Sequence, residues 1–155
     1  METKNKNINN IREFRSIIIG KLMTISGILQ RETNKLLLPY QLNQQQFSIL
    51  FEIAKAKDVN QKNMVNRLLL EKAHVSKVVK KLQIMGLIEI IPAQNDKRSA
   101  KLVPTQKGQK LISECQSVFY KWNKEWFNQF SEKELLQILK NVDKLQKAFI
   151  SKYSK

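Results

Sequence analysis

The residues with the clearest chemical potential gather in one basic segment, residues 72–86. It contains Lys72, Ala73, His74, Ser76, Lys77, Lys80 and Lys81, and no Asp or Glu from Lys72 through Gly86. Small, polar and basic side chains on one face of a helix suit the DNA major groove, because base edges there present a distinct donor and acceptor pattern. An acidic side chain on that face would repel phosphate. The segment therefore predicts a helix that contacts duplex DNA through Lys72, Ala73, His74, Ser76, Lys77 and Lys80.

A second basic element follows at residues 95–98, where Lys97 and Arg98 adjoin Asp96. We expect a projecting turn whose guanidinium enters the minor groove, since narrow grooves have an enhanced negative potential. Asp96 would orient Arg98 through a local hydrogen bond. Two simpler interpretations stay open: the tip is an ordinary solvated turn, and His74 is an exposed polar residue near a helix start.

Net charge is concentrated in the same part of the chain. The 155 residues carry 28 Lys and Arg against 13 Asp and Glu, a net charge of +15. Residues 55–110 hold 13 basic and 4 acidic side chains, whereas residues 1–54 and 111–155 each have a net charge of only +3. A clustered excess favours a polyanionic partner, nucleic acid first and an anionic membrane surface second. The alternative is a Lys-rich solvated surface.

The sequence lacks the residues that several other classes of function need. One Cys and one His exclude an internal disulfide and leave a Cys/His zinc site without ligands. The sequence has no Ser-His-acid arrangement, glycine-rich phosphate loop or paired carboxylates in an apolar setting, so we predict no enzyme, no cofactor and no metal. Without an 18-residue apolar run or a signal peptide, we expect a soluble cytoplasmic protein with no membrane partner.

Helical periodicity predicts the elements that precede and position the basic segment. Gly and Pro number only 4 and 3, and apolar residues recur at steps of three and four over residues 8–38. Asn43 and Gln46 form a capping box for a second helix, with a predicted buried side of Phe47, Leu50, Phe51 and Ala54. A third helix over 60–68 would bury Met64 and Leu68. The basic helix over 72–85 would bury Val75, Val78, Val79 and Leu82.

After Gly86 the pattern changes to two short segments, 87–91 and 100–103, that are typical of a β-hairpin. Thr105 can cap a fifth helix with the apolar stripe Leu111, Cys115, Val118 or Phe119, Trp122, Trp126 and Phe130. Ser131 and Glu134 form a second capping box, which opens a sixth helix with the stripe Leu135, Ile138, Val142, Leu145 and Phe149. We predict a mainly α fold of six helices with a small β-hairpin.

Several of these segments together resemble the MarR family of winged helix-turn-helix transcription regulators. They are the run from Val59 to Leu82, the sequence Gly86-Leu87-Ile88, the tip Asp96-Lys97-Arg98, and Leu102-Val103-Pro104-Thr105-Gln106-Lys107-Gly108. The wing pattern Asp-x-Arg, followed by a strand and Thr-x-x-Gly, is the most specific part. The resemblance implies a single domain over 1–155 with a winged helix-turn-helix lobe over 43–105. It also implies a sequence-specific regulator of double-stranded DNA, usually a repressor.

The resemblance further implies a homodimer joined by helices from both chain ends, here residues 8–38 and 128–152. Both stripes carry more apolar surface than a small domain should expose, which supports this independently. The implied interface residues are Ile8, Ile11, Ile18, Leu135, Ile138, Val142, Leu145 and Phe149. Two recognition helices about 34 Å apart would match a palindromic operator.

Members of the family often bind small anionic or phenolic effectors in a cleft between the dimer base and the DNA-binding lobe. An effector of this kind would lower DNA affinity by linkage, but periodicity identifies neither the molecule nor its pocket. The fifth helix borders that cleft, although a pair such as Trp122 and Trp126 is more typical of packing; Tyr40 is a further cleft candidate. Cys115 is expected in the core, where burial makes a thiol inert.

The alternative function is a non-specific basic protein that binds RNA or single strands. Such a protein needs exposed aromatic side chains that stack on unpaired bases. Most aromatic residues of this chain fall on apolar helix stripes, which favours the sequence-specific regulator.

Overall fold

The structure is a computed structural model that describes residues 2–56, 59–68, 70–92 and 100–153, with side chains from residue 10 to residue 152 of these. The elements are α1 (Glu2–Leu37), a short 3-10 helix η1 (Leu38–Tyr40), α2 (Gln44–Lys55), α3 (Gln61–Leu68), α4 (Lys72–Ile84), β1 (Ile88–Ile91), β2 (Lys101–Pro104), α5 (Gln106–Phe127) and α6 (Glu132–Tyr153). The strands pair antiparallel, with Ile88 opposite Pro104 and Ile91 opposite Lys101. The predicted six helices and hairpin are confirmed.

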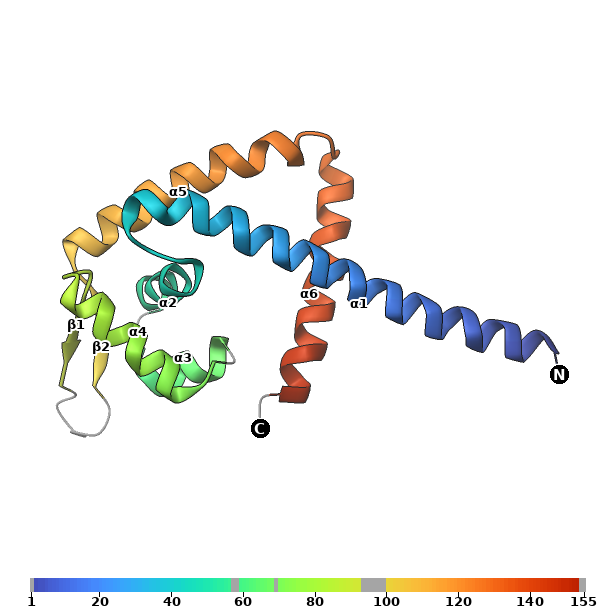
Figure 1. The fold of residues 1–155 in the computed structure, drawn as a ribbon, viewed down its shortest axis with the longest axis horizontal. Coiled ribbons are helices and arrows are strands. Elements are labelled where there is room, and N and C mark those ends of the chain that lie inside the picture. The colour runs from blue at the N-terminus through green and yellow to red at the C-terminus, as the bar shows by residue number, and fades with distance from the viewer. Residues whose placement is uncertain (1, 57–58, 69, 93–99, 154–155) are drawn as a thin grey trace.

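The molecule consists of a compact lobe and three long helices outside it, which are the terminal helices α1 and α6 and the connecting helix α5 (Figure 1). The lobe, residues 43–105, contains α2, α3, α4 and the hairpin, and lies below the C-terminal end of α1 and the start of α5. With 36 residues, α1 is about 54 Å long at 1.5 Å per residue, and its N-terminal end projects far from the lobe. Within the described residues, none of the helices has both the length and the apolar character that a bilayer crossing requires.

Local capping fixes where the helices begin. The Asn43 side chain accepts from the backbone N–H of Gln46 at 2.9 Å, and the Gln46 side chain accepts from that of Asn43 at 3.1 Å. The Thr105 hydroxyl accepts from the backbone N–H of Gly108 at 3.0 Å. The carboxylate of Glu134 accepts from the Ser131 hydroxyl at 2.7 Å and from its N–H at 2.8 Å, which lowers the pKa of Glu134. All three predicted caps are confirmed.

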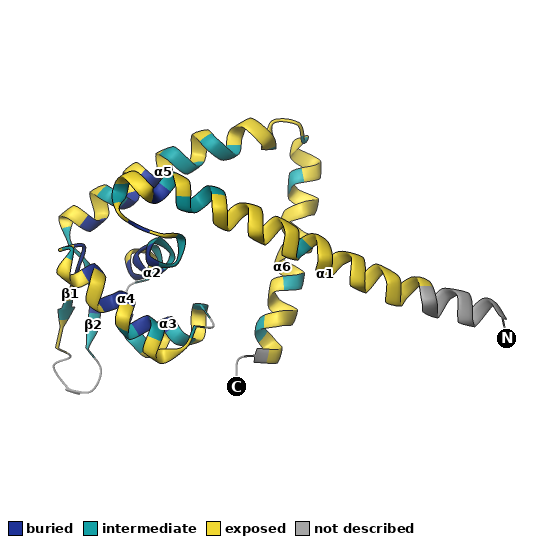
Figure 2. Cartoon of the chain, viewed as in Figure 1, coloured by how far each residue is buried: buried dark blue, intermediate teal, exposed yellow. Residues whose placement is uncertain are grey.

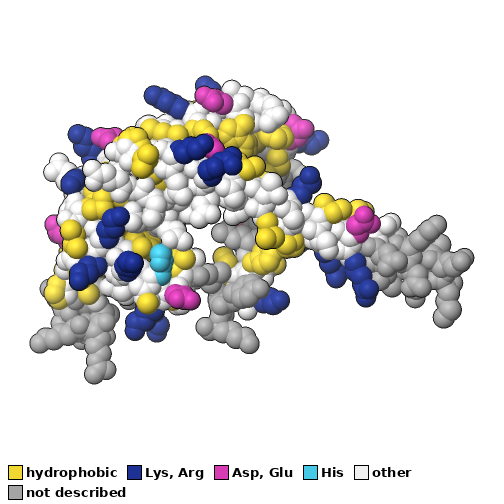
Figure 3. All heavy atoms as spheres, in the orientation of Figure 1, with side chains coloured by type: hydrophobic (Ala, Val, Ile, Leu, Met, Phe, Trp, Pro, Cys, Tyr) yellow, Lys and Arg dark blue, Asp and Glu magenta, His cyan; other side chains and the backbone are white. Residues whose placement is uncertain are grey.

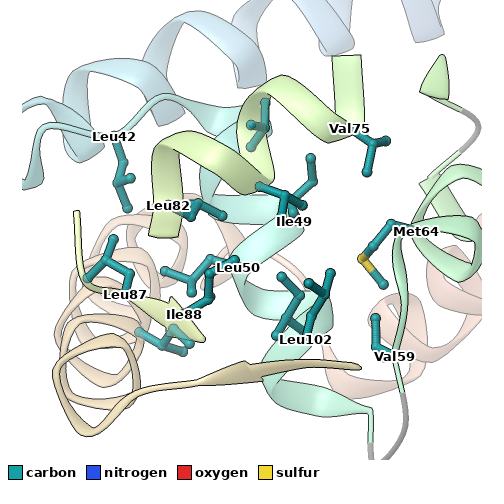
Figure 4. Close-up of a cluster of buried hydrophobic side chains, with 14 of the residues drawn as sticks. Leu42, Ile49, Leu50, Val59, Met64, Val75, Leu82, Leu87, Ile88 and Leu102 are labelled. Carbon is teal, nitrogen blue, oxygen red and sulfur yellow. The ribbon is translucent and has the colours of Figure 1, made fainter. Parts of the chain in front are cut away.

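The apolar core lies in and around the lobe (Figures 2 and 4), and its members fall between residues 37 and 115. The predicted inner face of α4 and the burial of Met64 are confirmed, whereas Leu68 is half-buried. The predicted buried side of α2 is partly wrong: Ala54 is exposed, Phe47 and Phe51 are half-buried, and the buried residues are Gln46, Ile49, Leu50 and Ile53. The reason is that α2 packs against α1, α3, α4, α5 and β2, so a helix in this central position has more than one inner face.

Contacts with the backbone just after α4 attach the hairpin and α5 to the end of that helix. Gly86 has a φ of +69°, which lets the chain turn directly into β1. The Thr105 hydroxyl donates to the carbonyl of Gly86 at 2.7 Å. A Cβ at Gly108 would collide with the carbonyl oxygen of Leu87, so α5 starts close against this turn only because residue 108 is glycine. The hairpin is therefore held in a fixed direction relative to α4.

Candidate nucleic-acid interface

The two faces of α4 differ sharply in chemistry. Its inner face consists of Val75, Val78, Val79 and Leu82, all buried. Its outer face exposes Lys72, Ala73, Lys77, Lys80 and Lys81, and Lys and Arg side chains gather over this part of the lobe in Figure 3. Because the helix has no acidic residue, its outer face is a continuous basic surface. The prediction that Lys72, Ala73, Lys77 and Lys80 point away from the protein body is confirmed.

The other two predicted contacts on α4, His74 and Ser76, are half-buried. The Ser76 hydroxyl donates to Gln61 Oε1 on α3 at 2.8 Å. The Nε2 atom of His74 is buried and has no hydrogen-bond partner in the described part of the chain. The bond to Gln61 places Ser76 at the α3 edge of the basic surface, whereas His74 lies about 200° away around the helix and flanks the other edge of that surface.

Gln61 is a residue that sequence reasoning missed. Its side chain joins the start of α3 to the second turn of α4, and the two residues are 15 positions apart. No periodic pattern connects positions at that separation, so the sequence contains no signal for the bond. Its effect is to fix how far α4 is rotated about its axis, and thus which side chains it exposes.

Short-range bonds hold α3 at a fixed angle to α4. Asn60 and Asn63 each accept from the other's backbone N–H, at 2.9 and 3.1 Å, which satisfies free donors at the start of α3. At the other end, Arg67 pairs with Glu52 of α2 at 3.4 Å. Together α3, the turn and α4 make a helix-turn-helix whose second helix carries the basic surface.

The hairpin beside α4 is anchored on both strands. Leu102 is 1% exposed, and its backbone N–H donates to the carbonyl of Val59 at 2.7 Å. This bridge extends the two-stranded sheet by one residue. Lys97 and Arg98, the predicted contacts at the hairpin tip, lie outside the described residues.

The described part of the chain has no cluster of side chains of the kind that holds a metal ion. No group of three His, Cys, Asp or Glu side chains is placed there to hold a metal ion. Cys115 is 1% exposed, which confirms its predicted place in the core. Burial, with a smaller contribution from Glu114, raises the pKa of its thiol to about 11, so the reactive thiolate is scarce near neutral pH.

The predicted interface residues at the chain ends are largely exposed in the single chain. Ile11, Ile18, Ile138, Val142 and Phe149 are all exposed, and Leu135 and Leu145 are half-buried. The side chain of Ile8 lies outside the described residues. No other described element packs extensively against α6, so the described residues leave most of its apolar stripe uncovered.

Comparison with known proteins finds one family model and several relatives that are similar to this chain. The model of the MarR family matches residues 40–99, from just before α2 to the hairpin. The HTH-type transcriptional regulator BilQ of Clostridioides difficile (strain CD3) is 29% identical over 134 residues, which cover 84% of this chain and 90% of that protein. Residues 40–99 therefore match the MarR family, and the chain over most of its length is similar to a named transcriptional regulator.

Solved MarR-family structures have the same fold. A MarR protein from Peptoclostridium difficile matches with a TM-score of 0.81 at 22% identity, over 88% of this chain and 89% of that one. A putative MarR family transcriptional regulator from Listeria monocytogenes, solved with a 26mer DNA, also matches with a TM-score of 0.81, at 23% identity over 87% of this chain and 90% of that one. The predicted MarR-like winged-helix architecture is thus confirmed, and the relatives are named as regulators rather than enzymes.

Proposed function

We propose that this MarR-family protein is a transcriptional repressor that binds a palindromic operator in double-stranded DNA as a homodimer. The observation that carries the proposal is the division of α4 into a buried apolar face and an exposed basic face. The buried face fixes the helix to the lobe, so the basic face is presented rigidly. A helix with these properties fits the width and the charge of the major groove.

The outer face of α4 supplies two kinds of contact. Lysine side chains neutralise phosphates or donate to guanine O6 and N7, and the methyl group of Ala73 can contact a thymine methyl group. Lys72, Ala73, Lys77 and Lys80 are the primary contacts on this helix, with His74 and Ser76 at its edge. Lys97 and Arg98 at the hairpin tip would add contacts in the adjacent minor groove.

The terminal helices would join two chains through residues 8–38 and 128–152. The exposed stripes of α1 and α6 support this, because removal of apolar area from water against a second copy favours association. The interface would include Ile8, Ile11, Ile18, Leu135, Ile138, Val142, Leu145 and Phe149. A twofold arrangement would present two α4 helices about 34 Å apart, one turn of the duplex.

Two findings on relatives support the DNA-binding and regulatory parts of the proposal. The Listeria protein with the same fold was solved with DNA, and BilQ is named a transcriptional regulator. Release by a small-molecule effector would follow from the same architecture, since a ligand that favours a different spacing of the lobes lowers DNA affinity by linkage.

Selection from a pool of random duplexes tests sequence specificity and yields the operator sequence in the same experiment. Repeated capture on the full-length protein should enrich a palindrome with half-sites about one helical turn apart. Affinity for the selected duplex should exceed that for a scrambled duplex by at least about 1000-fold at physiological salt.

The salt dependence of binding gives a second readout. The logarithm of affinity should fall with the logarithm of salt concentration by about 0.9 for each phosphate neutralised. Equal affinity for the selected and scrambled duplexes would refute specificity. Tighter binding to single strands than to duplex would instead support the non-specific nucleic-acid alternative.

A further inference from the structure

The hydroxyl of Ser76 lies at the α3 edge of the basic surface of α4, between two exposed lysines. Lys72 is one helical turn before it and Lys80 one turn after it, in the row that residues four apart form along a helix. Both lysines are exposed, whereas Ser76 is half-buried. A helix docked on DNA through these two lysines would therefore bring the Ser76 oxygen toward the same stretch of the groove.

The proton of this hydroxyl is already engaged within the protein. Ser76 Oγ donates to Gln61 Oε1 at 2.8 Å, a distance typical of O–H···O hydrogen bonds. A serine hydroxyl has one proton and two lone pairs, so a Ser76 that donates to Gln61 keeps only its capacity to accept. In the described part of the chain, neither of the two side chains has a further hydrogen-bond partner.

The elements around Gln61 hold its acceptor in place. Asn60 and Asn63 close the first turn of α3 through reciprocal bonds, and Met64, in the same helix, is completely buried. The helix also packs against α4, whose own inner face is buried. Gln61 is thus presented to Ser76 at a fixed position, which keeps the hydroxyl proton turned toward α3.

The chemistry of the major groove converts this orientation into a preference. Adenine N6 and cytosine N4 are donors there, whereas guanine O6 and thymine O4 are acceptors. A serine that is free to rotate can bond to either kind. A serine that can only accept bonds to an amino group, but it meets guanine O6 or thymine O4 with lone pair against lone pair, which penalises those bases.

We propose that Gln61 is a specificity-determining residue, which commits Ser76 to read an exocyclic amino group, that of adenine or cytosine, at one position of each half-site. Gln61 acts through Ser76, so it is a positioning residue and does not itself have to touch DNA. The inference rests on the proposed function, because it requires a duplex operator docked on α4.

Duplexes that lack single exocyclic groups test this preference. Base-pair substitutions in the selected operator first identify the position at which discrimination is lost in Ser76→Ala. At that position, deoxynebularine in place of deoxyadenosine, or deoxyzebularine in place of deoxycytidine, removes only the amino group. Wild-type affinity should fall about fivefold relative to Ser76→Ala, as expected for one hydrogen bond. Removal of the exocyclic oxygen from the partner base should cost less than about twofold on the same scale.

Variants of Gln61 separate the polarity of the bond from packing. Gln61→Glu keeps an acceptor beside Ser76 and should retain the preference at this position. Gln61→Met has a similar length but no acceptor, so the hydroxyl can rotate and donate; the preference over a base with an oxygen there should fall about fivefold, with other positions unchanged. A purely structural role would instead lower affinity for every duplex alike. Gln109→Met makes the same substitution at an exposed site on α5 and should leave all preferences unchanged.

Three results would overturn the inference in a protein that does select an operator. The first is that no operator position depends on Ser76. The second is that loss of the amino group costs wild-type affinity no more than loss of the oxygen from the partner base. The third is that Gln61→Met retains the full preference. Failure of operator selection itself would refute the proposed function and this inference with it, so the two failures are distinguishable.

Discussion

The lobe and the terminal helices differ in how far their apolar side chains are buried. In the lobe, Met64, Val75 and Leu82 are completely buried (Figure 4). On the terminal helices, Phe14 of α1 and Leu139 of α6 are 58% and 65% exposed. Both regions carry clear helical apolar stripes, so the sequence pattern alone does not distinguish them. The difference teaches that the lobe is stabilised from within, whereas the terminal helices leave much of their apolar surface exposed in the single chain.

This contrast also separates two roles in the proposed mechanism. A lobe with its own core can present α4 as a rigid basic surface, and its stability does not depend on protein concentration. Helices that complete their packing only against another chain set the distance between two such lobes. Any ligand or variant that alters the terminal helices would then change DNA affinity without touching α4.

The largest expected effect is loss of core packing in the lobe. Leu82→Ala should lower the free energy of unfolding by about 2–5 kcal/mol, because truncation of a fully buried leucine leaves a cavity. Urea unfolding followed by circular dichroism measures this. Ile84→Ala on the same helix is the control, since Ile84 is 77% exposed and should change stability by less than about 0.5 kcal/mol. Equal losses in the two variants would contradict the assignment of the two faces of α4.

The next effect concerns the terminal helices. Leu145→Glu places a charge in the proposed dimer interface and should weaken dimerisation by about 3 kcal/mol, roughly 100-fold. Leu136→Glu makes the same substitution at a side chain that is 60% exposed and lies about 180° around α6 from Leu145, and it should leave the dimer intact. Sedimentation velocity distinguishes the two. An undisturbed Leu145→Glu dimer would show that α6 does not join the chains where we place it.

At the predicted hairpin tip, Arg98→Ala should weaken operator binding by about 1–3 kcal/mol if the guanidinium enters the minor groove. The thermal unfolding midpoint should stay the same, so the loss can be assigned to contact rather than folding. Fluorescence anisotropy with a labelled operator gives the affinity. Unchanged binding would remove Arg98 from the interface and restrict DNA contact to α4.

A smaller change is expected for one lysine of α4. Lys77→Ala should weaken binding several-fold across all duplex sequences and lower the salt slope by about 1, as expected for one phosphate contact. Lys124→Ala removes an equally exposed cation from α5, away from the lobe surface, and serves as the control. The same salt slope in both variants and the parent would argue against phosphate contact by Lys77.

The last comparison concerns the reactivity of Cys115. Because the folded protein raises the pKa of this thiol from 9.0 to about 11, its stabilising contribution is complete below pH 9.0 and is lost as the pH rises toward about 11. At pH 8 the native thiol should react about 100-fold more slowly with a disulfide reagent than the urea-unfolded chain. Comparable rates in the two states would place Cys115 at the surface.

The parts of the fold that could be predicted from sequence are those set by neighbours along the chain. The capping boxes at Asn43 and Ser131, the cap at Thr105 and the two faces of α4 depend on residues within one or two turns of helix. Few other local conformations satisfy these side chains, and all four predictions are confirmed.

Features that depend on several elements at once could not be predicted in the same way. The surroundings of α2 make Ile49 and Ile53 buried and Ala54 exposed, although a single-stripe pattern favours other positions. Two single contacts join positions that are distant in the sequence: the Ser76–Gln61 bond and the bridge from Val59 to Leu102. No periodic pattern in the sequence indicates either contact. A groove lined by Ile25, Glu32 and Trp122, among others, likewise arises only when α1 and α5 come together.

Hydroxyl-radical footprinting on the selected operator is the most direct test of the division between lobe and terminal helices. The wild-type protein should protect two equal patches of backbone whose centres lie about one helical turn apart, and Leu145→Glu should abolish the paired pattern at the same concentration. A single uninterrupted patch, or one of variable position, would contradict the account, because it would mean that two α4 helices do not dock together on one duplex.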